Sequence, residues 1–351
     1  MFCSKCGHQV MDGDMFCRAC GNPLPARAMA YERETGNARS YPPTPAELPA
    51  QPAPPAQPAM PAAPRKPRRG WVTLALAAVL SVAILAWQLG GAIISMLTTL
   101  DMDLCVTLTG ALGAATGVLI LGGKSLFRFD RAAFVVAWKK GWWVVAVSVL
   151  LMLWEITNTV VSGEPIAEDG WPLRFIAILL LCVGVGYYEE SLFRGLVLGG
   201  LLDAFGGKKA GIVASVVLSS VVFGVMHIVG SELDPKEPLS LMQAFLKTLQ
   251  TGTYGFFLAA LVTKTGDLHG AIVLHALDDF FLMVPTSVLY SQPVETEYVT
   301  TGESALPTIM LYVVIILLYL PIVWQGVRLL GQVHAPNHGA LHEGPEETIA
   351  S

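Results

Sequence analysis

The chain has 351 residues, of which 53% are hydrophobic and only 14% are charged. With a mean hydropathy of +0.56, this composition excludes an ordinary soluble globular domain and is typical of a polytopic membrane protein. The formal net charge of −5 says less, because the positions of the charges matter more than their sum. We expect membrane lipid around the chain and no nucleic acid as a partner.

The first 24 residues predict a small zinc-binding unit. They contain two Cys-x-x-Cys pairs, each followed by a glycine that lets the backbone turn: Cys3, Cys6, Cys17 and Cys20. Four thiolates at this spacing can surround a structural zinc ion tetrahedrally. A segment this short would draw most of its folding energy from the metal. A redox pair or two disulfides is the less favoured alternative.

The next residues, 25–69, are predicted to be a linker. They are rich in Pro and Ala and poor in large apolar side chains, a composition typical of a disordered, partly polyproline-II spacer. The linker ends in the basic run 65–69, which is typical of an anchor at the membrane surface. We expect a transmembrane domain at 70–330 and a cytoplasmic tail at 331–351.

The transmembrane domain is predicted to be all-α, with about eight spans that are each long enough to cross a hydrocarbon core of roughly 30 Å. The expected spans are 71–97, 103–122, 134–160, 172–201, 211–230, 240–263, 267–290 and 306–329. Lys and Arg gather before the first span, after the even-numbered spans and at the end of the last, whereas Asp and Glu dominate the other connections. The positive-inside rule therefore predicts a multi-pass protein of the cell membrane with both termini in the cytoplasm.

The fourth span contains three charged residues, Glu189, Glu190 and Arg194, within an apolar run. Such residues are costly in lipid unless they are paired or line a cavity, and they usually mark a functional site. On a helix, Glu190 and Arg194 are four residues apart and share a face, so they can pair. Glu189 points about 100° away. We therefore expect Glu190 and Arg194 to be structural and Glu189 to be free for chemistry.

Two other spans add histidines and a carboxylate. His227 follows Phe223 by one helical turn in the fifth span, and His275 and Asp279 share one face of the seventh. At 1.5 Å per residue, Glu189, His227, His275 and Asp279 lie roughly 13–24 Å from the predicted cytoplasmic ends of their spans. Three spans are thus expected to bring these groups to a common level near the middle of the membrane.

An acid, two imidazoles and a second carboxylate in a pocket of low dielectric suit the activation of water for peptide hydrolysis. Glu189 would be the general base. His227 and His275 would either hold a divalent metal or donate hydrogen bonds to an oxyanion. Asp279 would complete the metal shell or orient His275. The residues alone leave both uses open.

A family resemblance rests on three motifs that occur in this order along the chain: Glu189-Glu190-x-x-x-Arg194, Phe223-x-x-x-His227 and His275-x-x-x-Asp279. They resemble the motifs of the CAAX protease and bacteriocin-processing family of intramembrane endopeptidases, over roughly residues 170–290. The resemblance implies an eight-helix bundle with a polar cavity, a catalytic role for the first glutamate, and a membrane-associated protein or peptide as substrate. The family is described both as metalloproteases and as metal-free glutamate proteases.

One residue departs from the family pattern. Its last motif often ends in Asn, where this chain has Asp279. An anionic side chain there favours a metal ion or a charged His275 over the oxyanion-binding role often given to that Asn. The N-terminal segment is similar to the small zinc ribbons of many bacterial membrane proteins, which implies a structural zinc. Such a ribbon would bind a protein partner, sense zinc, or only cap the N-terminus.

A second class of function is compatible with the same residues. A non-catalytic membrane protein could use the buried polar cluster as an ion or proton relay or as an immunity scaffold. Transporters usually carry internal repeats or paired broken helices, and the sequence has no convincing repeat.

Overall fold

The computed structural model describes residues 69–341, except 164, 168 and 295–297. The expected zinc ribbon with its four cysteines, the linker up to residue 68 and the tail from residue 342 lie outside the described residues. The described helices are α2 (Arg69–Leu97), α3 (Met102–Ile120), α4 (Arg131–Val161), α5 (Trp171–Glu189), α6 (Leu198–Phe205), α7 (Lys209–Met226), α8 (Pro238–Thr265), α9 (His269–Met283) and α10 (Ala305–Gly331).

Two of these helices are extended by π-helical segments. Glu190–Val197 joins α5 to α6, so that Trp171–Phe205 is one continuous helical span of 35 residues. Val284–Leu289 continues α9 in the same way. The long helices therefore agree with the eight expected spans, and within the described ranges no residue is in a strand.

Among the described residues, seven helices are long and apolar enough to cross a membrane, which makes the chain a multi-pass membrane protein. The eighth long helix, α8, has 28 residues but is not among the seven. Its first half carries Gln243, Lys247 and Gln250, and these side chains lower its hydropathy. The neighbours of α8 compensate for this polarity, since the helix packs extensively against α7 and α10.

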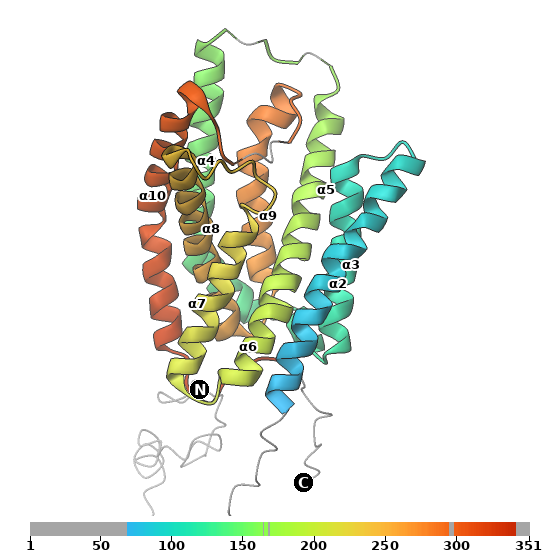
Figure 1. Cartoon of the computed structure of the whole chain (residues 1–351), viewed down its shortest axis with the longest axis vertical. Helices are drawn as coiled ribbons and strands as arrows, with labels where there is room; N and C mark the ends of the chain where they lie inside the picture. The colour runs from blue at the N-terminus through green and yellow to red at the C-terminus, as the bar shows by residue number, and fades with distance from the viewer. Residues whose placement is uncertain (1–68, 164, 168, 295–297, 342–351) are drawn as a thin grey trace, which may run out of the picture. The chain divides into compact units, whose positions relative to one another are not determined.

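The helices pack mainly in neighbouring pairs (Figure 1). The most extensive contacts join α8 to α10, α2 to α3, α7 to α8 and α4 to α9, and α5 lies between α3 and α9. Large apolar side chains on α2, α4 and α10 are exposed, as expected for surfaces that face lipid tails. The interior contains the side chains around which the site is built.

The two ends of the bundle differ in charge. Because the helices alternate in direction, α2 begins and α10 ends at the same end (Figure 1), which also contains the α3–α4, α6–α7 and α8–α9 connections. The basic residues at this end are Lys124, Arg128, Arg131, Lys208, Lys209, Lys264 and Arg328. We call it the basic end. The segment after α10 packs there as well, since Val333 and Leu341 are buried and the Asn337 amide donates to the Gly206 carbonyl (2.9 Å).

Candidate active site

The acidic motif lies where α5 changes into the π-helical segment. Glu189 is the last residue of α5, and Glu190 begins the segment, whose side chains are buried up to Leu196. A π-helix closes its hydrogen bonds over five residues instead of four and is frequent at functional sites. The backbone here therefore differs from the regular α-helix expected from the sequence, although the pairing inferred from that helix is present.

Glu190 and Arg194 form a fully buried ion pair. Arg194 Nη1 lies 2.9 Å from Glu190 Oε1, and the two side chains are 1% and 0% exposed. The guanidinium also donates through Nη2 to the Gly255 carbonyl (3.3 Å) and lies 4.2 Å from the centre of the Phe223 ring. A buried pair stabilises a fold only when further contacts offset the loss of water. The pairing of Glu190 with Arg194 that the helical spacing predicted is therefore present, and their role as a brace stays a prediction.

The same carboxylate also fixes the first histidine. His275 Nδ1 lies 2.7 Å from Glu190 Oε1, so the imidazole is held with Nε2 directed away from Glu190. This contact requires α5 and α9 to approach closely. Gly186 makes the approach feasible, because a Cβ at this position would lie 2.8 Å from the Ile272 carbonyl oxygen.

Glu189 lies on the other side of the helix, facing both histidines. Its Oε2 atom is 3.7 Å from His275 Nε2 and 3.9 Å from His227 Nε2. The Glu189 side chain is 19% exposed. The three groups expected to meet therefore do meet, from α5, from the end of α7 and from α9.

His227 is positioned by the end of its helix. α7 ends at Met226, a few residues before the expected end of the fifth span, and His227 caps it. Its Nδ1 lies 2.9 Å from the Phe223 carbonyl oxygen, which assigns a proton to Nδ1 and leaves Nε2 facing Glu189. The buried Phe223 ring makes edge contacts with both histidine rings, so it sets the separation between them.

The two aspartates of α9 have different surroundings. Asp279 Oδ2 lies 3.6 Å from His275 Nε2, and its side chain is 20% exposed. Asp278 is buried and accepts a hydrogen bond from Ser148 and another from the Tyr319 hydroxyl (3.3 Å). The structure thus places Asp279 beside His275, whereas Asp278 links α9 to α4 and α10.

Two polar cavities meet at this cluster. One, of about 400 Å³, is lined by Glu189 and His227. The other, of about 260 Å³, is lined by His227, His275 and Asp279. Both include Tyr298. The site therefore has space for water and for a segment of a polypeptide beside the acid and the imidazoles.

One cation in this site, Lys247, was not among the residues expected from the sequence. Lys247 of α8 lines the second cavity, with Nζ lying 4.0 Å from the centre of the Tyr298 ring. A lysine inside a predicted span is itself a signal of function. That signal was available in the sequence. The contacts of Ser148 and Tyr319 with Asp278 had no such signal, because they come from helices far away in the chain.

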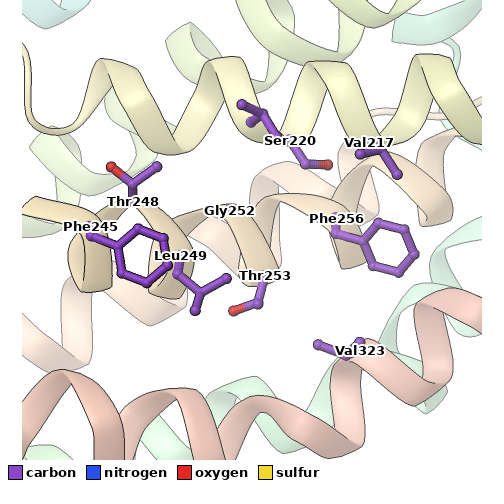
Figure 2. Close-up of a pocket in the computed structure, with 10 residues that line it drawn as sticks. Val217, Ser220, Phe245, Thr248, Leu249, Gly252, Thr253, Phe256 and Val323 are labelled. Atoms are coloured by element: carbon purple, nitrogen blue, oxygen red, sulfur yellow. The ribbon is translucent and has the colours of Figure 1, made fainter.

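A third cavity has no such groups. It is a groove of about 320 Å³ between α7, α8 and α10, and Figure 2 shows Val217, Phe245, Leu249, Phe256 and Val323 around it. Its lining contains no acid and no histidine. The groove is suited to an apolar chain and not to hydrolytic chemistry.

The site contains three side chains that the sequence suggested as ligands of an active-site metal. Among the described residues, no group of three or more His, Cys, Asp or Glu side chains is arranged to hold a metal ion. His227, His275 and Asp279, the ligands expected for an active-site metal, are therefore near one another without forming such a group.

One family model matches the part of the chain that contains the candidate site. The family model described as type II CAAX prenyl endopeptidase Rce1-like matches residues 170–281. These residues are similar to Rce1-like domains. The matched region contains all three motifs, from the acid pair in the fourth expected span to Asp279 in the seventh.

The Rce1-like match supports intramembrane protease activity in general terms. A zinc-ribbon domain model matches residues 2–24, where the four cysteines were expected to bind a structural zinc. Comparison with curated proteins and with solved structures gives no match to this chain. The Rce1-like domain is therefore joined, in one chain, to an N-terminal zinc ribbon and to further membrane helices.

Proposed function

We propose that this protein is an intramembrane endopeptidase that hydrolyses a peptide bond of a membrane-associated protein or peptide with a water activated by Glu189. The observation that carries the proposal is the convergence of Glu189 with His227 and His275, from three helices, at the wall of a polar cavity. Enclosed carboxylates and imidazoles of this kind are the groups that general acid–base catalysis requires.

The spacing of these groups suits a bridging water. The distances of 3.7 and 3.9 Å from Glu189 Oε2 to the two Nε2 atoms are too long for direct hydrogen bonds. Polar groups at this separation are commonly joined by a water. Glu189 Oε2 is also buried without a hydrogen-bond partner among the described residues, so it is available to accept the proton of that water.

The reaction follows from these positions. Glu189 accepts a proton from the water while the water oxygen adds to the carbonyl carbon of the substrate. His227 Nε2 accepts a hydrogen bond from the other O–H of the water and so orients it, since His227 Nδ1 is engaged with the Phe223 carbonyl. The second hydrogen stays on the attacking oxygen. Glu189 then returns the proton to the nitrogen of the leaving fragment, the C–N bond breaks, and the carboxyl product forms.

His275 is the group best suited to the oxyanion. Glu190 faces its Nδ1 and Asp279 faces its Nε2, an arrangement that suits a doubly protonated ring. Such a ring donates Nε2–H to the carbonyl oxygen as negative charge develops there. Asp279 would then orient the imidazolium, a role that an Asn at this position would fill less strongly.

We also propose the orientation and surroundings of the protein. The basic end would face the cytoplasm by the positive-inside rule, which would place both termini there and keep the ribbon cysteines in a reducing compartment. The substrate would reach the site from the membrane. The zinc ribbon would hold one structural zinc and offer a surface to a protein partner.

The test is cleavage in cells, followed by mass spectrometry of new protein termini in the membrane fraction. Wild type is compared with Glu189→Gln and with Glu155→Gln, a matched control because Glu155 is an exposed acid of another span. We expect new substrate termini with wild type and with the control. The rate at which they form should fall about 10²–10⁴-fold with Glu189→Gln. If the new substrate termini persist in the Glu189→Gln variant, the proposal of an endopeptidase is wrong and an ion or proton relay is favoured.

A further inference from the structure

A further polar cavity lies at the basic end of the bundle, apart from the two polar cavities of the candidate active site. It has a volume of about 410 Å³ and is enclosed by the segment between α3 and α4, by α6, by the end of α8 and by the chain after α10. The side chains relevant here are Ser125, Arg194, Lys264 and Asn337. Since a water occupies about 30 Å³ in the liquid, the cavity has room for a ligand of several heavy atoms.

The charge of this cavity has one sign. Its described lining includes the cations Arg194 and Lys264 and no Asp or Glu. It opens at the end of the bundle where the basic connections gather. A concave surface lined by one sign of charge raises the local concentration of the opposite ion. The cavity therefore favours an anion.

Two buried donors in the lining have no acceptor among the described residues. Arg194 is 2% exposed, and while Nη1 faces Glu190 and Nη2 donates to Gly255, Nε has no hydrogen-bond partner. The Ser125 hydroxyl is likewise buried and unpaired. Buried polar groups in native proteins are nearly always satisfied, and leaving each one unpaired is destabilising. An acceptor in the cavity would satisfy both.

We propose that this cavity binds a phosphate group, either inorganic phosphate or the phosphate of a lipid headgroup. A phosphate offers several strong acceptor oxygens directed to different sides, which matches donors contributed by three separate segments. Arg194 Nε, the Ser125 hydroxyl and the Lys264 ammonium are the groups that would bind it. The inference is independent of peptidase activity, although Arg194 would connect the ligand to Glu190 and thus to His275.

The experiment is calorimetric titration of the full-length protein in detergent, with inorganic phosphate in one arm and short-chain phosphatidic acid in the other. We compare wild type with Lys264→Gln and Ser125→Ala. The matched control is Lys208→Gln, because Lys208 is an exposed lysine at the same end and is not part of the cavity lining. Neither Ser125 nor Lys264 belongs to the catalytic machinery, and binding is measured without any substrate.

We expect saturable binding in at least one arm, about tenfold weaker in Lys264→Gln and about fivefold weaker in Ser125→Ala, with no change in Lys208→Gln. Binding in the lipid arm alone would identify the headgroup as the source, and binding in both arms would indicate free phosphate as well. Absence of saturable binding in both arms would overturn the proposal. Equal weakening by Lys264→Gln and Lys208→Gln would also overturn it, because general attraction to a basic surface would then explain the binding. Since Lys264 is exposed, its variant is expected to fold even if Ser125→Ala does not.

Discussion

The acid pair of the α5 motif and the acid pair of α9 have the same division of surroundings. In each pair, one carboxylate is buried and bound by neighbouring side chains. Glu190 is paired with Arg194 of its own segment and with His275 of α9, and Asp278 accepts hydrogen bonds from Ser148 of α4 and Tyr319 of α10. The adjacent carboxylate, Glu189 or Asp279, is about one-fifth exposed and faces His275 Nε2. Two neighbouring residues of the same type therefore have different roles, both in Glu189–Glu190 and in Asp278–Asp279.

Adjacent positions in the sequence can therefore have different roles inside a helix bundle. Consecutive helical residues point about 100° apart, so one side chain enters the packed interior while the next enters the cavity. The buried member holds the helices together, and the cavity member is left available for reaction. Substitutions at the four positions should therefore separate stability from cleavage.

The largest stability effect is expected for Glu190→Gln. It leaves Arg194 as an unpaired buried charge, which typically costs about 3–5 kcal/mol of the free energy of unfolding. Glu189→Gln removes no buried pair and should cost less than about 1 kcal/mol. Thermal unfolding of both variants in the same detergent checks the difference. Equal destabilisation by the two substitutions would contradict the assignment of Glu190 as the structural residue and Glu189 as the general base.

A compensating change should recover much of that loss. In the double variant Glu190→Gln/Arg194→Met the unpaired charge is absent, so we expect it to be more stable than Glu190→Gln by about 2 kcal/mol or more. Cleavage should stay low, because His275 has still lost the carboxylate at Nδ1. Additive destabilisation by the two substitutions would contradict the pairing.

The α9 pair should show the same separation with smaller effects. Ser148→Ala takes a hydrogen bond from the buried Asp278 and should cost about 1–3 kcal/mol of stability. Asp279→Asn should change stability little and lower the cleavage rate by about tenfold, since it removes the charge beside His275. Unfolding and cleavage measured on the same preparations check both values, and a stability loss confined to Asp279→Asn would reverse the assignment.

The smallest effect on the bundle is expected from the ribbon. Cys17→Ser should lose one bound zinc per chain, as measured by elemental analysis, because a structural site needs its four ligands. The thermal unfolding of the membrane helices should be unchanged within about 0.5 kcal/mol. A large shift in bundle unfolding would show that the ribbon stabilises the membrane domain.

Much of the fold and part of the candidate site could be predicted from the sequence. The number of long helices follows from apolar segments of sufficient length, and the pairing of Glu190 with Arg194 follows from helical spacing. The convergence of Glu189, His227 and His275 was expected because all three lie near the middle of their spans. These predictions rest on local periodicity and on the thickness of the bilayer, both of which a single sequence contains.

The remainder depends on contacts between distant segments. The π-helical turn has no periodic signal, because one extra residue per turn changes the spacing over only a few positions. The burial of Asp278 depends on Ser148 and Tyr319, which are 130 and 41 residues away in the chain. The polar cavity at the basic end is formed partly by residues after α10, which the sequence predicted to be a cytoplasmic tail.

The polarity of α8 has a consequence for how the protein is made. A segment with glutamine and lysine side chains in its first half partitions poorly into lipid by itself. Its entry into the bilayer is therefore coupled to α7, which is synthesised before it, and to α10, which is synthesised after it. Substitutions on the faces of α7 and α10 that cover α8 would reduce the yield of correctly inserted protein while leaving every reacting side chain intact.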